Sequence, residues 1–242
     1  MRKKILLLGG TGAMGTMLTG LLAKDNQVFI TSRSKRESTD PNISYIQGNA
    51  KETEFLGGLA KAEQYDAVVD FMVYTTKELN ERIDSLLAMT KQYIFISSAR
   101  VYADEETPIT EESPRLLEVC KDEEYLKTDE YALAKAREEN ILFDRKSKGA
   151  GNWTIVRPSL TYGEQRLQLG GLEKEAWLYR ALKGRPIVFS KDLTERYYTM
   201  TSGLDVAKGD CGLDRRAIGL GRMLSYSSGQ GVQVEGYFEY LS

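Results

Sequence analysis

An acid–base pair is the first chemistry that this sequence suggests. Tyr131 and Lys135 stand four residues apart in a segment of helix-forming residues, and side chains at that spacing lie on one face of a helix. A free tyrosine has a pKa of about 10 and is a poor base at neutral pH unless a cation stabilises its phenolate. The ammonium of Lys135 would supply that cation. The spacing therefore predicts that Tyr131 exchanges protons with a substrate.

A serine completes this set. The run that begins at Tyr93 reads as a buried strand, and it delivers Ser97 and Ser98 to the carboxyl edge of a sheet. Tyr131 and Lys135 follow about thirty residues later, in the order that a shared pocket requires. We expect Ser98 to hydrogen-bond a reacting oxygen while Tyr131 moves the proton.

A glycine-rich loop near the N-terminus predicts a bound dinucleotide. Three glycines, Gly9, Gly12 and Gly15, stand between an apolar run at 4–8 and a helical pattern at 13–24. The first two permit a tight turn and close approach of a pyrophosphate to the backbone, and the third lets the helix pack near the strand. The predicted cofactor-binding residues of this loop are Gly9, Thr11, Gly12, Ala13, Met14 and Gly15.

The end of the second apolar run, 27–31, bears on which dinucleotide is bound. An NAD-specific protein often has an acidic residue there for the adenosine ribose, whereas this chain has Ser32 and Arg33. A guanidinium is suited to a 2′-phosphate, so NADP is favoured over NAD as the cofactor. A solvated basic turn is the alternative reading of Arg33.

The composition excludes several classes of function. The chain has no histidine, which removes Ser-His-Asp hydrolysis and the usual His-containing zinc sites, and we predict no metal site. Its 33 Lys and Arg against 35 Asp and Glu argue against nucleic-acid or membrane binding. Cys120 and Cys211 are far apart in a chain without a secretory signal, so no disulfide and a cytoplasmic location are expected.

Alternation of short apolar runs with helical patterns predicts the fold class. The expected strands are 4–8, 27–31, 43–46, 67–71, 93–97 and 153–156, and the expected helices are 13–24, 52–61, 77–90, 129–148 and 172–182. This is the pattern of an α/β protein with a doubly wound parallel Rossmann sheet. We expect an NAD(P)-binding domain over residues 1–165 and a small, shortened C-terminal substrate lobe over 166–242, partly interwoven with it.

Three motifs together resemble a known family. Gly-Gly-Thr-Gly-Ala-Met-Gly at 9–15, Ser-Ser-Ala-Arg-Val-Tyr at 97–102 and Tyr-Ala-Leu-Ala-Lys at 131–135 resemble those of the NAD-dependent epimerase/dehydratases, in the extended short-chain dehydrogenase/reductase (SDR) family. The segment from Arg157-Pro158 to Tyr162-Gly163 is similar to a further family motif. The resemblance implies Ser98, Tyr131 and Lys135 as catalytic residues and a contact of Gly48 and Asn49 with adenine.

The resemblance implies an NAD(P)-dependent nucleotide-sugar epimerase or reductase. Ala99 and Arg100 stand where a 4,6-dehydratase would have an Asp-Glu pair, which disfavours dehydration. The segment 72–75 lacks the small residues that commonly line the nicotinamide, and the chain is short at its C-terminus. Two alternatives therefore stay open: a catalytically silent NAD(P)-binding sensor or scaffold, and a carbonyl reductase. Relatives often dimerise through two helices, for which 77–90 and 129–148 are the candidates.

Overall fold

A seven-stranded sheet is the centre of the computed structural model, which describes residues 2–105, 108–163, 166–167, 169, 172–188, 197–208, 222–226 and 232–233. All neighbouring strands of this sheet run parallel, in the order β10-β6-β5-β4-β1-β2-β3. Its strands are β1 (Lys4–Leu8), β2 (Gln27–Ser32), β3 (Ile43–Gln47), β4 (Ala67–Asp70), β5 (Tyr93–Ile96), β6 (Trp153–Pro158) and β10 (Arg222–Tyr226).

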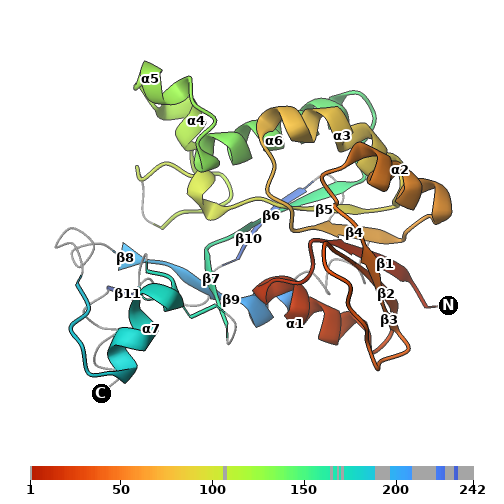
Figure 1. The fold of residues 1–242 in the computed structure, drawn as a ribbon. Coiled ribbons are helices and arrows are strands. Elements are labelled where there is room, and N and C mark those ends of the chain that lie inside the picture. The colour runs from red at the N-terminus through yellow and green to blue at the C-terminus, as the bar shows by residue number, and fades with distance from the viewer. Residues whose placement is uncertain are drawn as a thin grey trace.

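Helices cover both faces of this sheet (Figure 1). One face carries α2 (Thr53–Ala62), α3 (Thr76–Ala88) and α6 (Tyr131–Ser147), and the other carries α1 (Ala13–Leu22). Alternate residues of β1 serve the two layers: Leu6 and Leu8 pack on the side of α2 and α3, and Ile5 and Leu7 pack on the side of α1. Successive side chains of β1 point to opposite faces of the sheet. Because both faces are buried, residues 5–8 are all apolar and the strand reads as a continuous apolar run.

The remaining elements lie outside the central sheet. The connection after β5 contains a 3-10 turn, η1 (Ala99–Val101), and two short helices, α4 (Leu116–Val119) and α5 (Glu123–Leu126). Beyond β6 lie β7 (Leu160–Tyr162), α7 (Lys174–Leu182), β8 (Tyr197–Tyr198), β9 (Met200–Ser202) and β11 (Val232–Gln233). β7 pairs with β9 and β8 with β11, as two small sheets apart from the main one (Figure 1).

The predicted fold class is confirmed. Each of the six expected strands is present in the sheet, and the five expected helices correspond to α1, α2, α3, α6 and α7. The seventh strand, β10, was not expected. Of the predicted C-terminal lobe, residues 168, 170–171, 189–196, 209–221, 227–231 and 234–242 lie outside the described residues, Cys211 among them, so the extent of the lobe stays a prediction. Cys120 is a free thiol.

The strand order turns back between β1 and β4, because β2 and β3 extend to one side of β1 and β4, β5 and β6 to the other. In open parallel sheets, ligands bind outside the carboxyl ends of the strands at such a point. The glycine loop follows β1 there, and Ser97 and Ser98 follow β5 at the same edge.

Candidate functional site

The glycine loop, residues 9–15, joins β1 to α1 in a conformation that depends on its glycines. Gly9 has a φ of +67°, in the left-handed region that favours glycine, and its N–H donates to Thr31 Oγ1 at 2.9 Å. A Cβ on Gly15 would lie 2.5 Å from the carbonyl oxygen of Gly10. Gly15 therefore lets the helix approach the loop, as its place in the motif predicts, and Thr31 ties the loop to the end of β2.

The start of α1 is open to an anion. Gly12 is its N-cap residue; no side chain caps the helix, and its first turn has no acidic residue. A Cβ on Gly12 would meet nothing within 4 Å among the described residues. Unlike Gly15, Gly12 is thus not required by the packing of the protein itself. Uncapped amides at a helix N-terminus, beside a position kept clear of side chains, fit a bound pyrophosphate.

Met72 forms one wall of this loop. A Cβ on Gly9 would lie 2.7 Å from Met72 Sδ, so the methionine side chain lies directly against the first glycine. Its backbone N–H donates to Asp70 Oδ1 at 2.9 Å, which fixes the turn after β4. The sequence already indicated a bulkier wall here, and the structure gives the contact.

The two residues expected to choose between NAD and NADP differ in exposure. Ser32 is the last residue of β2 and is buried, and Arg33 follows it with an exposed side chain. The Arg33 carbonyl accepts a hydrogen bond from Gln47 Nε2 at 3.4 Å, which ties the end of β2 to the end of β3.

Gly48 and Asn49 have local structural roles. A Cβ on Gly48 would lie 2.1 Å from the ring of Phe55, so packing against α2 accounts for this glycine. Asn49 Oδ1 accepts from the Lys51 N–H at 3.1 Å, and its Nδ2 donates to Glu52 Oε1 at 3.1 Å. The Asn49 amide thus shapes the turn into α2, and its contact with adenine stays a prediction.

The two serines after β5 have different partners. Ser97 Oγ donates to Glu139 Oε1 at 2.7 Å and is committed to α6. Ser98 Oγ caps η1 by accepting from the Arg100 N–H at 3.2 Å, and 8% of Ser98 is exposed, against 2% of Ser97. Ser98, rather than Ser97, is therefore the serine that remains at the sheet edge.

Tyr131 is the first residue of α6, and 37% of it is exposed. The guanidinium of Arg100 lies 5.6 Å from the centroid of its ring. Arg100 is itself held by Glu130, since its Nη2 donates to Glu130 Oε1 at 2.8 Å. Burial raises the pKa of Glu130. The hydrogen bonds that Glu130 accepts from Tyr125 and from the Ala132 N–H, together with the charge of Arg100, lower this pKa by a larger amount, so it lies below its usual value. A cation that the sequence did not single out for this role thus lies over the tyrosine ring.

Lys135 lies one turn further along α6, with only 2% exposed. Its Nζ is 4.4 Å from the centroid of Phe95 in β5 and 3.0 Å from Glu138 Oε2. The structure therefore packs Tyr131 beside η1 and Lys135 on β5, both next to the segment that bears Ser98. Sequence reasoning missed Glu138, although a carboxylate three residues after the lysine was the available signal.

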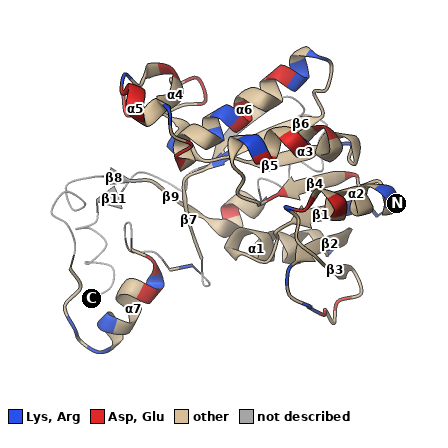
Figure 2. Cartoon of the chain, turned by 45° about the horizontal axis from the view of Figure 1, so that its top comes forward, with Lys and Arg blue, Asp and Glu red and all other residues tan. Residues whose placement is uncertain are grey.

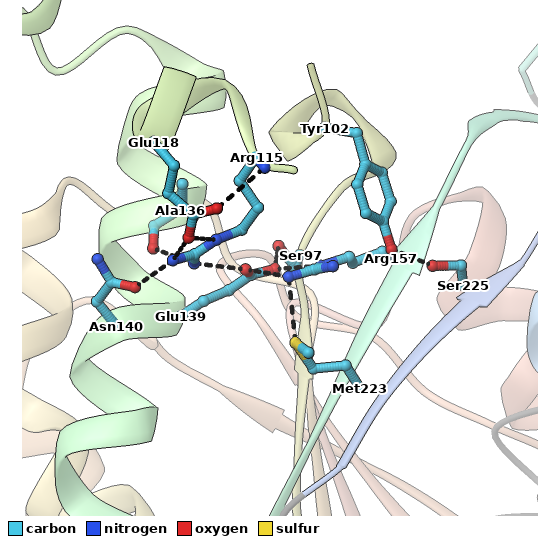
Figure 3. A network of polar contacts seen from close by, with 10 residues as sticks. All are labelled: Ser97, Tyr102, Arg115, Glu118, Ala136, Glu139, Asn140, Arg157, Met223 and Ser225. Carbon is cyan, nitrogen blue, oxygen red and sulfur yellow. Dashed lines mark hydrogen bonds and ion pairs between the residues drawn. The ribbon is translucent and has the colours of Figure 1, made fainter. Parts of the chain in front are cut away.

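A buried ion network holds α6 against β6 behind this site (Figure 3). Arg157 in β6 donates to both oxygens of Glu139, through Nε at 2.8 Å and Nη2 at 2.6 Å. Arg115 Nη1 also reaches Glu139 Oε2, at 3.2 Å. Burial by itself lowers the pKa of Arg157, but its hydrogen bonds with Glu139 outweigh this and raise it. The network also contacts β10, where Arg157 Nη2 lies 3.1 Å from Met223 Sδ.

A shallow groove of about 720 Å³ lies elsewhere. Phe143, Trp153 and Met223 are among its lining residues. Trp153 is the first residue of β6, so the groove is at the amino end of the strands, opposite the edge that bears Ser98. Within the described residues, no cluster of three or more acidic or cysteine side chains is arranged to hold a metal ion. None of the described helices is long and apolar enough to span a membrane.

A parallel doubly wound sheet with an uncapped glycine loop at its switch point defines the class: a nucleotide-binding Rossmann protein. The sequence model of the NAD dependent epimerase/dehydratase family matches residues 5–200. The chain belongs to that family, which confirms the predicted resemblance to the NAD-dependent epimerase/dehydratases.

Individual relatives span several named functions. The chain is 30% identical over 201 residues to the chloroplast stem-loop binding protein of 41 kDa b from Arabidopsis thaliana, covering 76% of this chain and 48% of that protein. It is 26% identical over 133 residues to UDP-glucose 4-epimerase from Lactobacillus helveticus, covering 46% of this chain and 40% of that protein. The chain thus spans less than half the length of these curated relatives.

A solved structure supports the fold. UDP-glucuronic acid 4-epimerase from Bacillus cereus, in complex with UDP-glucuronic acid and NAD, superposes with a TM-score of 0.78 at 14% identity. The match covers 98% of this chain and 82% of that chain.

Proposed function

We propose that this chain is an NAD(P)-dependent enzyme that acts on a nucleotide-activated sugar, as an epimerase or reductase that uses Ser98, Tyr131 and Lys135. The observation that carries the proposal is the shared sheet edge: the open N-terminus of α1 follows β1, and Ser98 follows β5 at the same edge, with Tyr131 and Lys135 packed beside it. A dinucleotide with its pyrophosphate on α1 would have its nicotinamide on the side of β4 and β5.

The fit of the cofactor rests on three features of the chain. The amides of Ala13 and Met14, after Gly12, would hold the pyrophosphate. The buried Nζ of Lys135 lies 3.0 Å from Glu138 Oε2 but has no partner of hydrogen-bond geometry among the described residues. A ribose hydroxyl would satisfy that amine. Arg33 binds the 2′-phosphate of NADP, which is the favoured cofactor. When bound, the nicotinamide exchanges a hydride with the substrate.

The chain's own residues handle the proton. Ser98 Oγ orients the sugar oxygen, and Tyr131 Oη takes up or returns its proton. Arg100 lies over the Tyr131 ring, and Lys135 lies one turn further along the same helix. Epimerisation needs no further acid or base, which makes it the simplest outcome. Relatives named for UDP-sugars support that class of substrate.

The decisive experiment is turnover with a panel of UDP- and dTDP-sugars. Purified protein is loaded with NAD(H) or NADP(H), and the absorbance of the reduced nicotinamide and the sugar products are followed. Tyr131→Phe is expected to lower turnover by at least about a hundredfold while cofactor binding is retained. The matched control is Tyr179→Phe, on the exposed face of α7, which should leave turnover unchanged.

The alternative functions predict different outcomes of the same experiment. A silent binding protein would bind the cofactor and convert no sugar; the contact of Met72 with Gly9 and the similarity to a stem-loop binding protein are what favour it. Adding a stem-loop, as RNA and as DNA, to the panel tests that relative's named property, against the predicted absence of nucleic-acid binding. A carbonyl reductase would consume NADPH steadily, whereas an epimerase regenerates its cofactor in each cycle.

A homodimer through α3 and α6 is part of the same proposal. These two helices lie side by side on one face of the sheet (Figure 1), as a four-helix interface between two copies requires. Figure 2 shows acidic and basic residues along α6, and of these Asp144 and Lys146 are exposed, so a second copy would meet charges of both signs. Light scattering on a size-exclusion column gives the mass, and a monomer would overturn this part.

A further inference from the structure

Glu138 is a buried carboxylate that the proposed chemistry leaves unused. It lies in α6 with 0% exposed, one turn after Lys135. Neither of its oxygens has a partner of hydrogen-bond geometry among the described residues. Removing an ion from water costs several kcal/mol unless a counter-charge and hydrogen bonds compensate it. The counter-charge is present, because Lys135 Nζ lies 3.0 Å from Glu138 Oε2.

The neighbouring carboxylate, Glu139, has a different arrangement although it is equally buried. Its two oxygens accept from Ser97, Arg115 and Arg157. Glu139 is therefore fully engaged in joining α6 to β6. Glu138 has none of these partners: Lys135 lies within ion-pair distance of it, and the charges of Asp70 and Asp129 act on it.

Asp70, at the end of β4, does not replace Glu138 as the partner of Lys135. Its Oδ2 accepts from Tyr93 at 2.7 Å and from Tyr74 at 3.0 Å, and its Oδ1 accepts from the Met72 N–H. Burial raises the pKa of Asp70, with the charge of Lys135 acting in the opposite direction. The titratable and charged groups that face the Lys135–Glu138 pair are Asp70, Tyr74, Arg82, Tyr93 and Asp129.

We propose that Glu138 is a positioning residue for Lys135: it holds the buried ammonium over Phe95 and offsets its charge at the place where the nicotinamide binds. The inference rests on the proposed cofactor site. A nicotinamide ring carries a positive charge when oxidised and none when reduced. An uncompensated ammonium nearby disfavours the oxidised form, and an ionised Glu138 removes that penalty.

The charge of the pair changes within the physiological range. Burial raises the pKa of Glu138 to about 7, against the opposing charge of Lys135. Below that pH the pair carries one positive charge, and above it the pair is neutral. The affinity for oxidised relative to reduced cofactor therefore rises with pH in the wild type, by about tenfold between pH 6 and pH 8.

The test compares two adjacent glutamates. Dissociation constants of NAD⁺, NADH, NADP⁺ and NADPH are measured calorimetrically at pH 6 and pH 8 for the wild type, Glu138→Gln and Glu139→Gln. In Glu138→Gln the oxidised-to-reduced affinity ratio is expected to be the same at both pH values and to favour the reduced form. In Glu139→Gln the ratio is expected to change with pH as in the wild type, whatever the loss of stability.

A second measurement needs no cofactor. In protein labelled with ¹⁵N-lysine, the paired Nζ of Lys135 gives a slowly exchanging NMR signal, assigned by its absence in Lys135→Arg. That signal is expected to persist in Glu139→Gln and to vanish in Glu138→Gln. If Glu138→Gln does not fold, Glu138→Asp replaces it: the retained charge keeps the pH dependence and the shorter side chain moves the signal.

The two proposals fail separately. If the Lys135 signal depends on Glu138 but the protein binds no dinucleotide, the proposed function is contradicted and the positioning role of Glu138 stands. The role of Glu138 is overturned if the oxidised-to-reduced affinity ratio still depends on pH in Glu138→Gln. It is also overturned if the Lys135 signal is the same in Glu138→Gln as in the wild type.

Discussion

The guanidinium of Arg157 and the carboxylate of Glu139 meet through two hydrogen bonds of 2.8 and 2.6 Å, with 1% and 0% of their side chains exposed. Ser97 and Arg115 contact the same carboxylate. One ion pair thus joins β6, the end of β5 and α6 directly behind Ser98. It holds in register the two elements that bear the proposed catalytic residues.

Glu139→Gln should therefore destabilise the protein strongly. The substitution leaves Arg157 buried without its counter-charge, which typically costs about 3–5 kcal/mol of the free energy of unfolding. Urea unfolding followed by circular dichroism measures this loss. The control is Glu124→Gln, which removes an exposed ion pair with Lys127 and should change the stability by less than about 1 kcal/mol. Equal effects of the two substitutions would contradict the assignment.

Local patterns were sufficient to predict the central sheet and the glycine loop. The central strands β1, β4, β5 and β6 are short apolar runs because both their faces are buried, and that property is visible in the sequence. β10 was not found, because its run, Arg-Met-Leu-Ser-Tyr, is less apolar than the runs of the central strands.

The proposed site shows a similar limit. The spacing of Tyr131 and Lys135 correctly placed both on α6, but it did not reveal their neighbours. Arg100 lies over the tyrosine ring and Glu138 beside the lysine because η1 and β5 pack against that face. Gly48 gives a second example: the family motif suggested adenine, whereas the Phe55 ring explains the absence of a side chain.

The glycines of the loop should separate packing from binding. A Cβ on Gly15 would clash with the Gly10 carbonyl, whereas a Cβ on Gly12 would meet nothing. Gly15→Ala is expected to lower the free energy of unfolding by more than about 1 kcal/mol. Gly12→Ala is expected to leave the stability nearly unchanged and to weaken dinucleotide binding by at least about tenfold. Calorimetric titration with NADPH and urea unfolding measure both, and unaltered binding in Gly12→Ala would contradict a pyrophosphate at α1.

Arg33 should decide the preference between the two dinucleotides. Its exposed guanidinium is placed to form a charge-assisted hydrogen bond with a 2′-phosphate, which is worth about 1.5–3 kcal/mol. Arg33→Ala is expected to weaken NADP(H) binding by about tenfold or more and to leave NAD(H) binding unchanged. The control is Lys24→Ala, which removes one positive charge at an exposed position after α1 and should alter neither NADP(H) nor NAD(H) binding. Tighter binding of NAD than NADP by the wild type would contradict the preference.

Glu138 should make the stability depend on pH between about 4.5 and 7. Its pKa is raised from 4.5 to about 7 in the folded protein, chiefly by burial, so the folded state keeps this proton to a higher pH than the unfolded chain does. The contribution to stability is therefore greatest below pH 4.5, falls as the pH rises to 7 and is constant above, with a total loss on the order of 3 kcal/mol.

Glu138→Gln removes that titration and keeps the shape of the side chain. The free energy of unfolding of the variant, minus that of the wild type, is expected to rise between pH 4.5 and pH 7 and then to level off. Asp70, whose pKa is also raised by burial, is present in both proteins, so its own titration cancels in the difference apart from its charge interaction with Glu138. Urea unfolding at half-unit intervals of pH measures it. A difference that stays constant or falls with pH would mean that Glu138 is ionised throughout this range in the folded state.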